Sequence, residues 1–82
     1  MNPQGMENKL RGIVAEYFGV NVSDVTDEKS FVEDFGANIE DMYNIVLDIE
    51  AETEIEISDE ELDSIRTVGD LIQLVMKKDD RE

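Results

Sequence analysis

Carboxylates are the side chains with which this sequence could do chemistry, and thirteen of its 22 acids lie between residues 30 and 65. That segment contains no Lys or Arg, because the bases stop at Lys29 and resume at Arg66. Clustered carboxylates attract basic proteins and divalent cations, whereas acid–base catalysis needs a pair held in a cleft with separated pKa values. The segment therefore predicts a docking surface for a basic partner, with a merely solvated face as the alternative.

Composition excludes several functions. The 82 residues include no His and no Cys, which removes the usual general base, thiol chemistry, disulfides and Cys/His zinc sites. A net charge of −15 argues against binding to nucleic acids and to anionic membranes. No apolar stretch is long enough to span a bilayer, and residues 1–5 lack the pattern of a signal peptide. We expect a cytoplasmic, monomeric domain over 1–82 that is not an enzyme, with a core from about 5 to 77 and a frayed tail at 78–82.

Apolar periodicity predicts two long helices in the first two thirds of the chain. The first, over about 5–18, ends before Gly19 and has a stripe of Met6, Leu10, Ile13, Val14, Tyr17 and Phe18. The second begins after Asn38, a good N-cap with Asp41 three residues later, and continues to about residue 52. Its expected inward stripe is Ile39, Met42, Tyr43, Val46 and Ile49, widened by Ile45 and Leu47.

The remaining segments predict shorter elements. Residues 19–37 read as a long loop that packs its apolar residues into the bundle, namely Val20, Val22, Val25, Phe31 and Phe35. Residues 53–57 read as an extended connector. Capping-box spacings at Ser58 and Thr67 open a short helix over about 59–65 and a last helix from residue 68. The result is an all-α four-helix bundle with a long first loop and a short third helix.

Three short sequence blocks, with the second predicted long helix between the first and the second of them, follow one another in an order that is typical of a known family. The blocks are Ser30-Phe31-Val32-Glu33-Asp34-Phe35-Gly36-Ala37, then Ile55-Glu56-Ile57-Ser58-Asp59-Glu60-Glu61, then Thr67-Val68-Gly69-Asp70. From Leu10 to about Val75 the chain thereby resembles the acyl carrier protein family. The resemblance implies the same four-helix bundle, and a role related to fatty-acid or polyketide biosynthesis.

Members of that family carry a phosphopantetheine arm on the serine of an Asp-Ser-Leu motif at the start of the second helix. The matching positions here are Asn38-Ile39-Glu40. Ile39 has no nucleophilic oxygen, so no phosphodiester can form there, and we expect no phosphopantetheine and no other cofactor. The serines of the chain, Ser23, Ser30, Ser58 and Ser64, all lie elsewhere.

The resemblance also implies partners, which in this family are synthases and acyltransferase-type enzymes with basic patches. The family's acids are kept at Asp41 and Glu50, absent at Asn38, Asn44 and Ala51, and new at Glu40 and Asp48. The predicted docking residues are Glu40, Asp41, Asn44, Asp48, Glu50, Glu56, Asp59 and Glu60. The expected acyl-pocket-like core is Val46, Ile49, Thr53, Ile57, Leu62 and Ile65, in which Thr53 replaces an aromatic residue that is usual in the family.

Three alternatives remain open from the sequence. The chain could be a genuine acyl carrier of a specialised pathway, with an engineered or compensated attachment site. It could instead be an acidic protein that binds divalent cations diffusely. A selective EF-hand over residues 48–59 is disfavoured, because Thr53 replaces the required Gly and the segment overlaps a helix. Ile39 could also be a packing residue against the 31–37 segment.

Overall fold

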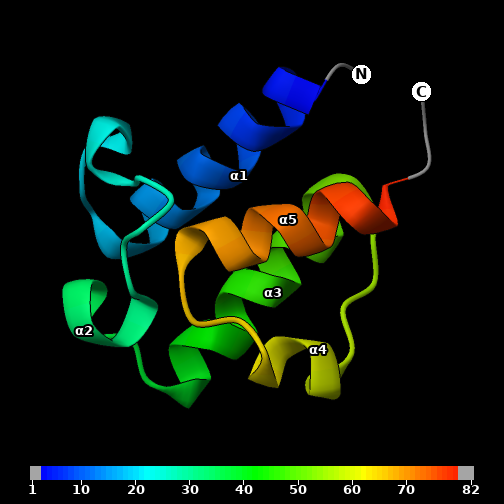
Figure 1. The fold of residues 1–82 in the computed structure, drawn as a ribbon. Coiled ribbons are helices and arrows are strands. Elements are labelled where there is room, and N and C mark those ends of the chain that lie inside the picture. Colours follow the sequence, from blue (N-terminus) through cyan, green and yellow to red (C-terminus); the bar gives the residue numbers. More distant parts are fainter. Residues whose placement is uncertain (1–2, 80–82) are drawn as a thin grey trace.

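The computed structural model describes residues 3–79, which form an all-helical bundle (Figure 1). The helices are α1 (Pro3–Phe18), a 3-10 turn η1 (Val22–Asp24), α2 (Phe31–Phe35), α3 (Ile39–Thr53), α4 (Asp59–Asp63) and α5 (Val68–Lys78). No β-strand occurs in residues 3–79, which confirms the predicted all-α class. None of the helices in this range is long and apolar enough to cross a membrane. Most of the tail predicted to fray, residues 80–82, lies outside the described residues.

The core lies where α1 packs against α3 and α5. In Figure 1, α5 crosses in front of α3. The predicted stripe of α1 is confirmed at Met6, Leu10 and Val14, which are fully buried. Leu71, Ile72 and Val75 of α5 are also buried, and Gly19, which follows the predicted end of the first helix, adopts the left-handed conformation typical of a residue after a helix.

The segment 19–37 is more ordered than the sequence analysis predicted, because it contains η1 and α2. Two signals for α2 are present in the sequence. Ser30 Oγ accepts the Glu33 N–H (3.0 Å), and Gly36 ends the helix with a positive φ of 66°. Val25 and Phe31 are buried as expected, and Phe35 packs against the core. The expectation was wrong for two other valines of the segment, Val20 and Val22, which are exposed; Val22 begins η1, none of whose residues is buried.

The second half of the bundle follows the prediction closely. Capping boxes begin α4 at Ser58 and α5 at Thr67. The predicted connector starts one residue later than expected, because Thr53 still belongs to α3. Glu54 ends the helix in the left-handed conformation (φ 61°), and the connector that follows buries Ile55 and Ile57. Backbone hydrogen bonds from Phe31 N–H to Arg66 O and from Val68 N–H to Lys29 O, both 3.0 Å, fix the start of α2 against the start of α5. These bonds hold the segment before α2 beside the segment before α5.

Candidate attachment and docking site

A reciprocal capping box fixes the beginning of α3. The Asp41 N–H donates to Asn38 Oδ1 (2.8 Å), and the Asn38 N–H donates to Asp41 Oδ2 (3.0 Å). Both bonds satisfy backbone donors that would otherwise have no partner at a helix N-terminus. The predicted N-cap is therefore confirmed, and it holds Ile39 as the first residue of the helix.

A second set of hydrogen bonds ties this end of α3 to α1. Tyr17 OH donates to Asp41 Oδ1 (2.8 Å), and Asn44 Nδ2 donates to Tyr17 OH (3.1 Å). The Asn38 N–H and then the Tyr17 hydroxyl stabilise the carboxylate, so the pKa of Asp41 lies below its ordinary value. The bond from Asn44 lowers the pKa of Tyr17. The bond to Asp41, burial and the nearby Asp41 and Asp48 charges outweigh it, so that this pKa is raised.

Ile39 points outward from this fixed helix end, with 60% of its surface exposed. The interpretation of Ile39 as a residue packed into the 31–37 segment is therefore wrong for most of its side chain. The exposed remainder borders a surface hollow of about 350 Å³ between α2, α3 and α4. The hollow is lined by Val32, Ala37, Asn38, Ile39, Met42, Leu62, Asp63 and Ile65.

The structure divides the expected stripe of α3 between two faces. Met42, Ile45, Val46 and Ile49 are buried, as predicted. Ile39, Tyr43 and Leu47 are exposed, so the expectation that they face the core was wrong. A helix with apolar residues on so much of its circumference cannot bury all of them in a bundle that covers one side. The sequence contained the signal in the four-residue spacing of these three positions, but the prediction treated it as a wide inward stripe.

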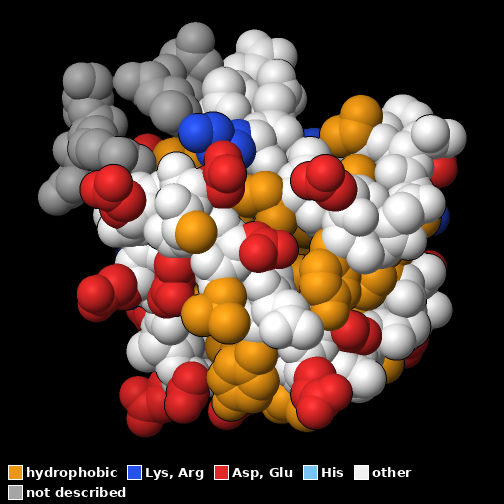
Figure 2. Space-filling model, turned by 180° about the vertical axis from the view of Figure 1, so that it is seen from behind, with side chains coloured by type: hydrophobic (Ala, Val, Ile, Leu, Met, Phe, Trp, Pro, Cys, Tyr) orange, Lys and Arg blue, Asp and Glu red, His pale blue; other side chains and the backbone are white. Residues whose placement is uncertain are grey.

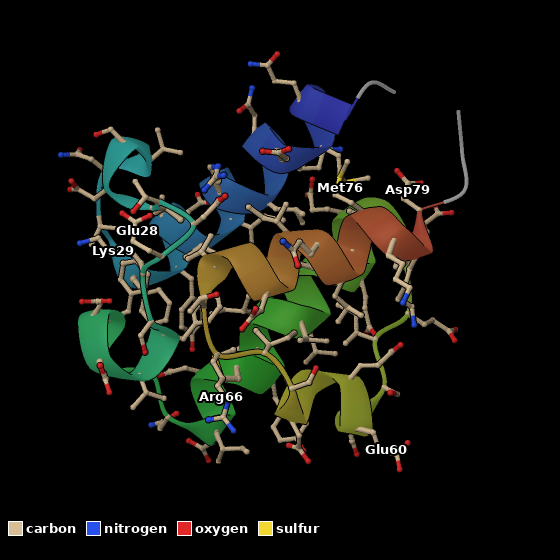
Figure 3. All side chains as sticks on the ribbon, in the orientation of Figure 1. Glu28, Lys29, Glu60, Arg66, Met76 and Asp79 are labelled. Atoms are coloured by element: carbon tan, nitrogen blue, oxygen red, sulfur yellow. The ribbon has the colours of Figure 1, made fainter. Side chains whose placement is uncertain are left out.

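The predicted docking residues lie along α3, the connector and α4. Glu40, Asn44, Asp48, Glu56, Asp59 and Glu60 are exposed, and Glu60 points away from the bundle in Figure 3. Asp41 and Glu50 are half-buried and also have local partners, since Glu50 Oε2 accepts the Ile57 N–H (2.9 Å). No group of three or more carboxylates among residues 3–79 is arranged to hold a metal ion. Residues 48–53 are helical, which contradicts an EF-hand loop there.

The expected acyl-pocket-like residues come together in the interior. All six are buried, and Leu62 and Ile65 also line the hollow beside Ile39. Thr53 is the polar member of the set. Its hydroxyl donates to Ile49 O (2.7 Å) and accepts the Ile55 N–H (3.2 Å), so it terminates α3 and begins the connector.

Ion pairs position the elements that border this site. Lys78 Nζ on α5 contacts both carboxylate oxygens of Glu61 on α4, at 2.7 and 2.9 Å. The bond from Lys78 and then the Ser58 N–H hold the pKa of Glu61 below its ordinary value. Arg11 on α1 pairs with Asp27 and donates to Val25 O (2.7 Å), which anchors the loop before α2. Arg66 extends from the connection between α4 and α5 (Figure 3).

Residues 8–75 match the family model described as "Phosphopantetheine attachment site". The chain belongs to the acyl carrier protein family. It is 37% identical over 71 residues to an acyl carrier protein of Thermotoga maritima, covering 87% of this chain and 88% of that protein.

Other relatives agree with this assignment. An acyl carrier protein of Clostridium perfringens is 36% identical over 70 residues, which cover 85% of this chain and 92% of that protein. The solved structure of an acyl carrier protein from Enterococcus faecalis superposes with a TM-score of 0.81 at 28% identity, covering 96% of this chain and all of that one. Proteins of this family act as carriers, which agrees with the expectation that the chain is not itself a catalyst.

Proposed function

We propose that this chain is an acyl-carrier-like domain, related to fatty-acid biosynthesis, that receives no phosphopantetheine arm and acts by docking on a basic protein partner. The observation that carries the proposal is the exposed Ile39 at the first position of α3. Its hydrocarbon side chain offers no oxygen to a phosphoryl group. The position is exposed and lies at a capped helix start, but its side chain cannot accept a phosphoryl group.

The serines of the chain support this proposal because the hydroxyls of three of them form local hydrogen bonds at helix ends. Ser30 and Ser58 accept hydrogen bonds from the Glu33 and Glu61 N–H groups, at 3.0 and 3.1 Å, as helix N-caps. Ser64 donates to Glu61 O (2.7 Å) at the end of α4. Ser23 is exposed in η1, which comes before α2 and therefore well before the α3 N-terminus in the sequence. None of these hydroxyls occupies the capped helix start at which Ile39 lies.

Charge supports the docking part of the proposal. The exposed acids of α3, the connector and α4 lie in a segment without any Lys or Arg, so a positive surface would meet little local repulsion. Such complementarity mainly sets the association rate and the choice of partner. A synthase or acyltransferase-type enzyme with a basic patch fits this surface. Because Asn44 and Ala51 stand where the family commonly has acids, the pattern favours a different partner over simple loss of docking.

The test is a modification assay on matched variants. Wild type, Ile39→Ser and Val22→Ser are each incubated with a phosphopantetheinyl transferase and coenzyme A, and then weighed intact. We expect no mass gain for wild type or for Val22→Ser, in which the new serine is exposed but lies outside α3. A gain of one phosphopantetheine by wild type would refute the proposal. Modification of Ile39→Ser would show that only the acceptor residue was lost, and its absence would show that the docking surface has changed as well.

A further inference from the structure

Four large apolar side chains are exposed on α2 and α3. Val32, Ile39, Tyr43 and Leu47 expose 65, 60, 42 and 61% of their surface. The three on α3 recur every four residues and so share one side of the helix. Val32 on α2 lines the same hollow as Ile39. We call these four residues the α3 apolar strip.

The grouping of these residues matters more than their exposure. Single exposed apolar residues are common on soluble proteins, but adjoining ones mark interaction surfaces. Figure 2, which shows the face behind that of Figure 1, has orange apolar side chains at the surface between red carboxylates. Glu40 and Asp48 are exposed next to strip residues in the sequence of α3, and Asp63 lines the hollow. An apolar centre with a negative rim is the result.

The strip is also held in place before any partner arrives. Its Ile39 end is fixed by the capping box between Asn38 and Asp41, and Tyr17 ties that box to α1. The helix itself fixes Tyr43 and Leu47 relative to Ile39. A surface that loses little freedom on binding retains more of its interaction energy as affinity.

We propose that the α3 apolar strip, with Ile39 as its anchor, binds a basic amphipathic helix of a protein partner; this deepens the proposed docking function and rests on it. From Ile39 to Leu47 the strip is roughly 12 Å long, which is about two turns of a helix. Two turns present a matching apolar stripe at three- and four-residue spacing, and Lys or Arg beside that stripe would face the acidic rim. Ile39 thus makes a direct protein contact where relatives attach their arm.

Charge favours a foreign helix over a second copy of this chain. Each copy has a net charge of −15, and residues 30–65 of both copies would bring acids against acids. A basic helix relieves that repulsion. Self-association through the strip is an outcome that the experiment below also detects.

The test is a methyl NMR titration with a short synthetic helical peptide made of Leu on one face and Lys on the other. We expect saturable binding, with the largest shift changes at the methyl groups of Val32, Ile39 and Leu47. Ile39→Ser should weaken binding about tenfold, as expected for loss of an anchor, while Val22→Ser should leave the affinity unchanged. Both variants alter exposed residues, and thermal melts of each would verify that the fold is retained.

Three results would overturn this inference. Binding that is unaffected by Ile39→Ser would show attraction by charge alone, and shift changes centred away from the strip would place the contact elsewhere. Sedimentation of the free chain as a dimer that Ile39→Ser dissociates would assign the strip to self-association. Because the titration involves no arm, its failure is distinguishable from failure of the proposed function, which modification of wild type would reveal.

Discussion

The two faces of α3 have similar residues and opposite roles. On the inner face, Met42, Ile45, Val46 and Ile49 are buried against the core. On the outer face, Ile39, Tyr43 and Leu47 remain exposed although two of them are as apolar as the inner residues and the third is aromatic. The first set is buried in the core with α1 and α5, and this burial stabilises the fold. The second set keeps 42 to 61% of its surface exposed, so burial in the bundle accounts for less of it, and under the proposed function these residues meet a partner.

The largest expected effect is a difference in the free energy of unfolding between substitutions on the two faces. Ile49 is fully buried, and Ile49→Ala should lower the free energy of unfolding by about 2–5 kcal/mol through lost burial and the cavity left behind. Leu47→Ala, two residues away and exposed, should change it by no more than about 0.5 kcal/mol. Urea unfolding followed by circular dichroism measures both. Equal losses would show that the outer face contributes to the core as much as the inner face does, which would contradict the distinction between the two faces.

The next largest loss of stability is expected at Thr53, the buried last residue of α3. Thr53→Val removes the hydroxyl that accepts the Ile55 N–H, and this should cost about 1–3 kcal/mol because the buried donor loses its acceptor. Thr53→Ser is the control, since it keeps the hydroxyl. Urea unfolding of both variants is the measurement. A Thr53→Val protein as stable as Thr53→Ser would show that the hydroxyl does not hold the connector in place.

A smaller effect is expected at the helix start, which positions both faces. Asn38→Ala removes the acceptor for the Asp41 N–H and should cost about 1 kcal/mol of stability. Asn38→Asp keeps a good N-cap and should retain most of it. Thermal melts compare the three proteins. If Asn38→Ala unfolds at the temperature of wild type, the capping box does not fix the position of Ile39.

The smallest effect is a pH dependence. The folded-state pKa of Asp41 is lowered below its ordinary value of 3.8, so its carboxylate stabilises the fold above that pH and loses this contribution as the pH falls through the folded pKa. The stability difference between wild type and Asp41→Asn should therefore be complete near neutral pH and should shrink below about pH 4. Melts over a pH series are the measurement. A difference that is constant with pH would contradict the role of the ionised carboxylate.

Much of this fold could be predicted from local signals. The N-cap at Asn38, the capping boxes at Ser58 and Thr67 and the helix end before Gly19 each depend on a few neighbouring residues, and all four are confirmed. The helix α2 was missed although Ser30 and Gly36 signal it, because a five-residue helix has too few turns to show periodicity.

The surface of α3 shows what local signals do not determine. Whether Tyr43 or Leu47 faces the core depends on where α1 and α5 pack, and that is a property of the whole bundle. The bonds from Tyr17 to Asp41 and from Asn44 to Tyr17 join residues 24 and 27 positions apart, so spacing along one helix could not reveal them. The hypothesis that Ile39 stands where the family has its serine comes from the sequence alone. The exposure of Ile39 could not be predicted in this way.

The central claim is that the outer face of α3 presents an apolar contact in place of an attached cargo. Producing the wild-type chain in growing cells together with a phosphopantetheinyl transferase, and weighing the purified protein intact, tests it most directly. We predict only the mass of the unmodified chain, under conditions in which a co-produced carrier with the Asp-Ser-Leu motif is fully modified. A wild-type chain that carries the arm would contradict the claim.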